Sequence, residues 1–90
     1  MTSINFFAKA EHAMREYEQC FKESHLKEAL DFYSRAIAKD VTQGEAYYKR
    51  SFVYGLLEDY DNQNKDLDMA VRIFEDKSKL DCQHLVGHFL

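Results

Sequence analysis

Apolar residues recur along the chain at intervals of three or four, which is the spacing of one face of an α-helix. The pattern predicts five helices, at about residues 4–22, 26–39, 44–57, 59–74 and 78–90. The chain contains no proline, so these boundaries rest on capping residues and polarity alone. For that reason the segment from Phe74 to Ser78 is open to a second interpretation, in which the last two helices are one continuous helix.

Capping residues support several of these boundaries. Thr2 and Ser3 are candidate caps for the first helix, and Ser24-His25 is expected to form the turn after it. Thr42, with Glu45 three residues later, has the spacing of a capping box and predicts the start of the third helix. Ser78, with Asp81 three residues later, is a weaker version of the same signal at the start of the last helix.

The helical spacing also predicts which side chains are buried. In the second helix, one apolar stripe faces the first helix and contains Leu26, Ala29, Leu30, Tyr33, Ala36 and Ile37. In the fourth helix, the residues expected to point inward are Tyr60, Leu67, Ala70, Val71 and Phe74. The residues expected to point outward are Asp61, Asn62, Lys65, Asp68 and Arg72. Cys20 falls on a predicted core position of the first helix.

The chain also resembles itself when it is shifted by about 34 residues. The shift pairs Glu11 with Glu45, Ala36 with Ala70, and Ile37 with Val71, so that apolar residues meet apolar residues. A period of this length indicates a helix-turn-helix repeat, which buries its apolar face only by stacking on a neighbouring repeat.

The repeated unit resembles a tetratricopeptide repeat. The residues that carry the resemblance in the second unit are Tyr47, Ser51, Tyr54, Leu67 and Ala70, and those in the first unit are Ala29, Tyr33 and Ala36. Three features depart from the family pattern: Tyr17 stands where a small residue is usual, Gln63 replaces an alanine, and no proline follows either second helix. The resemblance implies an all-α fold of antiparallel helix-turn-helix repeats, an α-solenoid of five helices.

The same resemblance implies a domain organisation. A single domain is expected over residues 1–90, with the first repeat at about 10–43 and the second at about 44–77. The segment at about 78–90 is then a capping helix that covers the apolar face of the last repeat.

Composition narrows the possible partners and locations. The formal net charge is −4 and no run of Lys or Arg exceeds a pair, so a nucleic-acid partner is not expected. No stretch is apolar enough to span a membrane, and the N-terminal segment lacks the pattern of a signal peptide. We therefore predict no membrane partner and a cytoplasmic location. The two cysteines, Cys20 and Cys82, are interpreted as reduced thiols.

The sequence contains no recognisable catalytic or cofactor motif. It lacks a Gly-rich phosphate loop, a Cys-x-x-Cys pair, a Gly-x-Ser-x-Gly turn and a His-Glu-x-x-His pair, so we predict that the protein is not an enzyme and holds no cofactor. The carboxylate pairs Glu58-Asp59 and Asp66/Asp68 are interpreted as solvated residues. Asp81, His84 and His88 share one helix face at a spacing that suits zinc, but a fourth ligand is missing, so we favour a solvated polar face.

The remaining candidate site is a surface groove. In tetratricopeptide repeats the first helix of each repeat lines a concave groove, and the matching positions here are Met14, Glu18, Phe21, Glu45, Tyr48, Lys49, Phe52, Leu56, Cys82 and Val86, with Glu11, Lys22 and Lys79 beside them. Some family members grip a peptide carboxylate with Lys, Arg and Asn side chains. Of the five residues at those positions here only one can donate to a carboxylate: they are Met14, Glu18, Lys49, Cys82 and Val86.

The predicted function is therefore binding of a protein or peptide partner in the groove without a carboxylate clamp. Two alternatives stay open. Tyr48, Phe52 and Phe21 are core residues if a neighbouring repeat or the capping helix covers them. The chain is a self-association module, and so a homo-oligomer, if its C-terminal helix pairs with a second copy.

Overall fold

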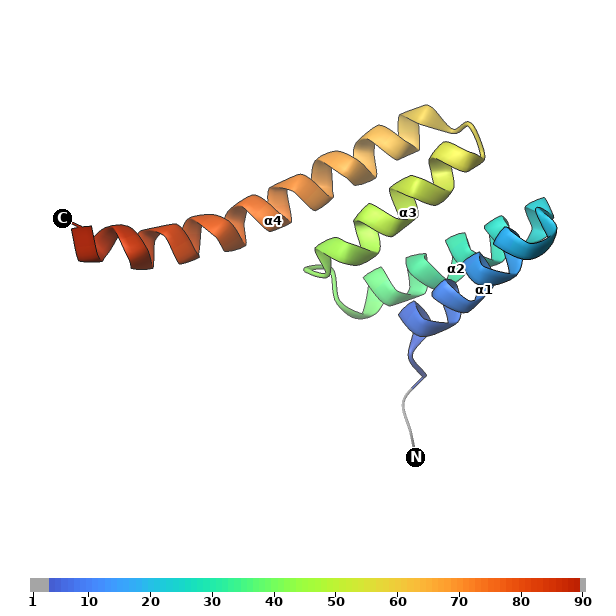
Figure 1. The fold of residues 1–90 in the computed structure, drawn as a ribbon, viewed down its shortest axis with the longest axis horizontal. Helices are drawn as coiled ribbons and strands as arrows, with labels where there is room; N and C mark the ends of the chain where they lie inside the picture. Colours follow the sequence, from blue (N-terminus) through green and yellow to red (C-terminus); the bar gives the residue numbers. More distant parts are fainter. Residues whose placement is uncertain (1–3, 90) are drawn as a thin grey trace.

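The computed structural model describes residues 4–89, and within that range it describes the side chains of residues 4–76. The described residues form four helices and no strand: α1 (Phe6–Cys20), α2 (Glu23–Lys39), α3 (Gly44–Leu56) and α4 (Tyr60–Phe89). Each helix packs on the next one along the chain. Figure 1 shows α3 between the α1–α2 hairpin and α4. The fold is all-α, as the sequence predicts.

The prediction of five helices is wrong. Residues 60–89 form one continuous helix, so the predicted break near residue 78 and the separate capping helix at 78–90 are absent. Figure 1 shows the C-terminal part of α4 continuing away from the other three helices. The physical reason is that Glu75, Asp76 and Lys77 include good helix formers, and neither proline nor glycine interrupts the backbone there.

The turn between α1 and α2 also differs from the prediction. Asn5 caps α1, because its side chain accepts a hydrogen bond from the backbone N–H of Ala8 at 3.0 Å. Thr2 and Ser3, the predicted caps, lie outside the described residues. The helix ends at Cys20, and Phe21 takes a left-handed conformation with φ of 55°. The turn is therefore Phe21-Lys22, and Ser24-His25 belongs to the first turn of α2.

The predicted capping box at the start of α3 does not form. The helix begins at Gly44 after Gln43, which makes no side-chain cap bond. Thr42 is held in the preceding turn, because the Asp40 carboxylate accepts hydrogen bonds from its backbone N–H at 3.0 Å and from its hydroxyl at 2.6 Å. A local side-chain bond to Asp40 has replaced the cap bond that the spacing suggested.

The core lies among α1, α2 and α3. Small residues, Ala10, Ala13 and Ala29, let the helices approach closely, and the larger Leu26, Tyr33 and Val53 fill the space between them. The Tyr33 ring packs edge-on against Phe7, with ring centroids 5.6 Å apart. The buried stripe predicted on α2 is confirmed, apart from Leu30, which is half-buried. Cys20 was predicted in the core and is instead exposed at the end of α1.

The predicted inner face of α4 is mostly wrong. Of the five residues expected to point inward, only Ala70 is buried, while Tyr60, Leu67, Val71 and Phe74 are exposed. The helix packs on α3, and within the described part of the chain no other helix makes a comparable contact with it. Asp66, which was interpreted as a solvated carboxylate, is buried.

Candidate partner-binding groove

A small pocket opens between α1 and α3, with α2 at its floor. Its volume is about 130 Å³. Four of the residues that line it come from α1, one from α2 and two from α3: Glu11, Met14, Arg15, Glu18, Tyr33, Lys49 and Phe52. The predicted groove residues Met14, Glu18, Lys49 and Phe52 are therefore brought together. We call this space the α1–α3 pocket.

The other predicted groove residues lie around the pocket or beyond the described side chains. Tyr48 and Leu56 lie one helical turn before and after Phe52 on α3, so the three form one stripe. Phe21 follows the last residue of α1, and Glu45 lies close enough to Tyr33 to affect its pKa. Cys82, Val86 and Lys79 lie outside the described side chains, as do Asp81, His84 and His88.

The aromatic residues of the groove are on the surface. Tyr48 is 53% exposed, Phe52 58% and Phe21 72%. They are therefore not part of the core that the described helices form. Phe21 contacts the ring of Tyr17 edge-on, with centroids 5.6 Å apart.

Tyr33 was predicted only as a core residue, yet it also lines the pocket. Its side chain is almost fully buried, and its hydroxyl makes no hydrogen bond to any residue that the structure describes. The pKa of the Tyr33 phenol is raised to about 12, mainly by burial and to a smaller extent by the nearby carboxylates of Glu11 and Glu45. The phenol is therefore protonated at neutral pH. The sequence gives no sign of this role, because an aromatic residue on a buried stripe is normally only core.

Two charged residues that line the pocket, one on α1 and one on α3, do not pair with each other. Glu11 and Lys49 are both half-buried, and neither makes an ion pair or hydrogen bond within the described part of the chain. Arg15 and Glu18 lie at the exposed rim. The pocket thus presents two acidic and two basic side chains, with an apolar surface from Met14 and Phe52 between them.

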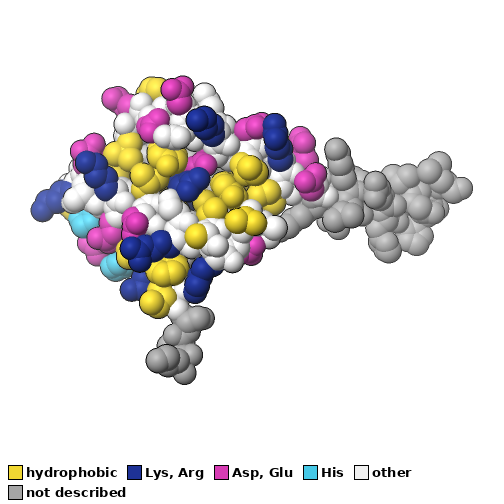
Figure 2. Space-filling model, turned by 180° about the vertical axis from the view of Figure 1, so that it is seen from behind, with side chains coloured by type: hydrophobic (Ala, Val, Ile, Leu, Met, Phe, Trp, Pro, Cys, Tyr) yellow, Lys and Arg dark blue, Asp and Glu magenta, His cyan; other side chains and the backbone are white. Residues whose placement is uncertain are grey.

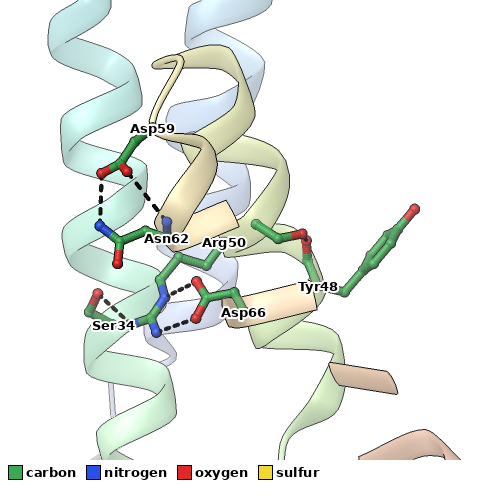
Figure 3. A network of polar contacts seen from close by, with 7 residues as sticks. Ser34, Tyr48, Arg50, Asp59, Asn62 and Asp66 are labelled. Carbon is green, nitrogen blue, oxygen red and sulfur yellow. Dashed lines mark hydrogen bonds and ion pairs between the residues drawn. The ribbon is translucent and has the colours of Figure 1, made fainter. Parts of the chain in front are cut away.

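A polar network holds α3 from its other side. The Arg50 guanidinium donates two hydrogen bonds to the Asp66 carboxylate of α4 and a third, at 3.1 Å, to the hydroxyl of Ser34 on α2. Figure 3 shows these three residues converging from three helices, while the Tyr48 side chain points away from them. The network therefore fixes the rotation of α3 that presents Tyr48 and Phe52 on the opposite face.

Aromatic rings enclose the same guanidinium. The Arg50 carbon Cζ lies 5.7 Å from the centre of the Tyr47 ring and 5.8 Å from that of Tyr54. The hydrogen bonds to Asp66 raise the pKa of Arg50, which outweighs the opposing effect of burial. Sequence reasoning missed this site because closely spaced carboxylates such as Asp66 and Asp68 on a helix normally face solvent. The signal available was that Arg50 lies on the same helix face as Tyr47 and Tyr54, three residues before it and four residues after it.

Exposed apolar residues also occur outside the groove. On α4 they are Tyr60, Leu67, Met69, Val71 and Phe74. Figure 2 shows hydrophobic side chains gathered in patches on the face opposite to the view of Figure 1, with charged side chains between and around them. Among the described residues, no helix combines the length and the hydropathy needed to cross a membrane. The same residues contain no cluster of three or more side chains suited to bind a metal ion.

Comparisons of the chain with protein-family models, with curated protein sequences and with solved structures gave no match.

Proposed function

We propose that the chain binds a protein or peptide partner through the groove formed by α1 and α3. The observation that carries this proposal is the exposure of Tyr48 and Phe52, one turn apart, beside the α1–α3 pocket. Exposed aromatic residues lower solubility, and they are the residue type that most often supplies binding energy at protein interfaces. Helix α3 carries these two aromatic residues, and the hydrogen bonds of Arg50 hold the opposite side of the helix in place, so α3 is suited to present them to a partner.

We further propose that the fold is related to the tetratricopeptide repeats. Two successive helix hairpins, α1–α2 and α3–α4, support this relationship, as do the residues that the two units share. The single-domain organisation, the absence of enzymatic activity and the cytoplasmic location stay predictions from the sequence.

The proposed binding does not use a carboxylate clamp. Of the clamp positions with described side chains, Met14 and Glu18 cannot donate a hydrogen bond from their side chains, and only Lys49 can. Glu18 would also repel a carboxylate. A partner is therefore expected to contribute an apolar side chain to Phe52 and Met14, with no requirement for a free C-terminus.

The test compares the native chain with the Tyr48→Ala/Phe52→Ala double variant in their binding of proteins from the source cell. Proteins retained by the native chain are identified, and the affinity of each is then measured for both forms. We expect a loss of about 2 kcal/mol or more in binding free energy. The free energy of unfolding should change by no more than about 0.5 kcal/mol per exposed site.

Tyr60→Ala is the matched control, because Tyr60 is as exposed as Phe52, at 58%, and lies on α4 outside the groove. It should bind the partner like the native chain. If the double variant binds as well as Tyr60→Ala does, the groove is not the binding surface.

Self-association through α4 is the second candidate. Leu67, Val71 and Phe74 form an exposed apolar stripe at the spacing of a helix that packs on another helix. Sedimentation equilibrium of the native chain and of Leu67→Glu/Val71→Glu distinguishes the candidates. A concentration-dependent dimer that the double substitution abolishes supports self-association, and a monomer at all concentrations contradicts it.

A further inference from the structure

The α1–α3 pocket contains three polar groups whose hydrogen-bonding capacity the described part of the chain leaves unused. They are the hydroxyl of Tyr33, whose side chain is almost fully buried, and the half-buried side chains of Glu11 and Lys49. Polar groups that are taken out of water normally have a partner, because leaving them unpaired is costly. No fully enclosed polar atom among the described side chains lacks a partner, so these three groups reach the open space of the pocket. That geometry indicates a ligand with matching polar groups.

The charges around the pocket restrict the chemistry of that ligand. A carboxylate placed near Lys49 would also lie near Glu11 and Glu18, and an ammonium group placed near Glu11 would lie near Lys49 and Arg15. An ion of either sign therefore meets repulsion as well as attraction. A neutral group with a donor at one end and an acceptor at the other meets attraction at both ends.

The backbone peptide group is such a group, with one N–H donor and one C=O acceptor. Glu11 is an acceptor only, Lys49 is a donor only, and the Tyr33 hydroxyl can donate. We propose that the pocket binds one main-chain peptide group of the partner, with its N–H donated to Glu11 and its C=O accepting from Tyr33 and Lys49. Because Tyr33 keeps its proton at neutral pH, it is available as the donor.

This inference rests on the proposed function and names the class of partner. Peptide groups inside a helix or sheet are already paired, so the occupant is an extended, linear segment with free backbone groups. The apolar surface of Met14 and Phe52 beside the polar groups is suited to contact the next side chain of that segment. A folded helical partner would leave Tyr33, Glu11 and Lys49 without their ligand.

The experiment uses linear peptides selected on the intact chain from a random display library. Peptides whose binding needs Tyr48 and Phe52 are kept, and each is resynthesised with a single backbone N-methyl group at every position in turn. N-methylation removes one N–H donor while the side chain stays the same. We expect one position at which it lowers affinity about tenfold or more, with much smaller effects at the neighbouring positions.

Two variants of the protein identify the groups in contact. Tyr33→Phe removes only the hydroxyl and should lower affinity about tenfold while the denaturation curve is unchanged. When the peptide carries the N-methyl group at the sensitive position, its loss of affinity for Glu11→Ala should be much smaller than its loss of affinity for the native chain. The reason is that the N-methyl group and the Glu11→Ala substitution remove the same hydrogen bond. His12→Ala, which changes an exposed α1 residue outside the α1–α3 pocket, is the control and should behave like the native chain.

Two results would overturn the inference and leave the proposed function standing. One is that groove-dependent peptides tolerate N-methylation at every position and bind Tyr33→Phe normally, which would mean that side chains alone carry recognition. The other is that no linear peptide is selected although a folded partner binds and requires Tyr48 and Phe52. If the partner also binds the Tyr48→Ala/Phe52→Ala variant as tightly as the native chain, both the inference and the proposed function are wrong.

Discussion

Arg50 on α3 and Asp66 on α4 form a bidentate ion pair, with Nε 2.6 Å from Oδ2 and Nη2 2.7 Å from Oδ1. Their side chains are 19% and 8% exposed. The other ion pairs within the described residues join side chains of one helix and lie at the surface. Arg50–Asp66 is therefore the pair that connects two helices, and it lies on the side of α3 opposite Tyr48 (Figure 3).

Replacing Asp66 by Ala should strongly destabilise the fold. The change leaves the Arg50 guanidinium partly buried without its carboxylate, and loss of one partner of a buried pair costs about 3–5 kcal/mol. Because Arg50 keeps some exposure, we expect a value near the lower end, about 3 kcal/mol. The measurement is the free energy of unfolding by urea.

The matched control is Asp68→Ala, which breaks the exposed pair between Asp68 and Arg72 on the same helix. It should cost less than about 1 kcal/mol. A second comparison, Arg50→Met/Asp66→Leu, removes both charges and should be much more stable than Asp66→Ala. Equal losses for Asp66→Ala and Asp68→Ala would show that burial of the Arg50 pair has no special role.

Alkaline pH should destabilise the fold through Tyr33. Its pKa is raised to about 12 in the folded chain, from the ordinary value of 10.0, so the folded state holds the phenolic proton more tightly than the unfolded state does. The resulting stability is fully present below pH 10 and is lost as the pH rises through 12. A shift of this size corresponds to roughly 2–3 kcal/mol.

The measurement is chemical denaturation at several pH values from 8 to 12, on the native chain and on Tyr33→Phe. The other tyrosines and the lysines are present in both proteins, so the comparison isolates the contribution of Tyr33. The expected result is a steeper loss of stability in the native chain. Parallel curves for the two proteins would contradict the assignment to Tyr33.

Phe21 should tolerate glycine better than alanine. Its φ of 55° lies in the left-handed region, which residues other than Gly or Asn rarely adopt because it costs them about 1–2 kcal/mol. Both substitutions remove the ring contact with Tyr17, but only glycine also relieves the backbone. We expect Phe21→Gly to be more stable than Phe21→Ala by about 1 kcal/mol in thermal or urea unfolding. Equal stabilities would mean that the turn relaxes to another conformation.

Much of the fold could be predicted from the sequence, because helical periodicity depends on local spacing. The stripe of Leu26, Ala29, Tyr33, Ala36 and Ile37 predicts the buried face of α2 correctly. The same periodicity could not decide whether residues 60–89 form one helix or two. The residues between Phe74 and Ser78 suit both a helix and a polar break, and no proline decides between the two.

The sequence predicts only those site residues whose positions match the groove positions of the repeat family. Met14 and Phe52 were placed in the groove by the resemblance to a repeat family, and they do line one pocket. Asp66 was misread because its burial is produced by Arg50 of a different helix, which no local pattern reveals. Tyr33 is predicted only as a core residue, since the burial of its ring gives no sign that it also lines a pocket with Glu11 and Lys49.

A peptide ending in Glu-Glu-Val-Asp, the ligand of clamp-bearing repeats, should bind no better than a scrambled acidic peptide of the same composition. Of the predicted clamp positions with described side chains, Lys49 is the only cation, and Glu11 and Glu18 line the same pocket. Coulomb repulsion from these two carboxylates offsets the attraction to Lys49 and to Arg15 at the rim. Titration of both peptides at low and at physiological salt makes the comparison, with Glu45→Lys, an exposed groove residue outside the clamp positions, as the control variant. That variant should bind both acidic peptides more tightly and to the same extent, since it changes charge without building a clamp. Micromolar, salt-sensitive binding of the Glu-Glu-Val-Asp peptide alone would show that the groove recognises a carboxylate after all.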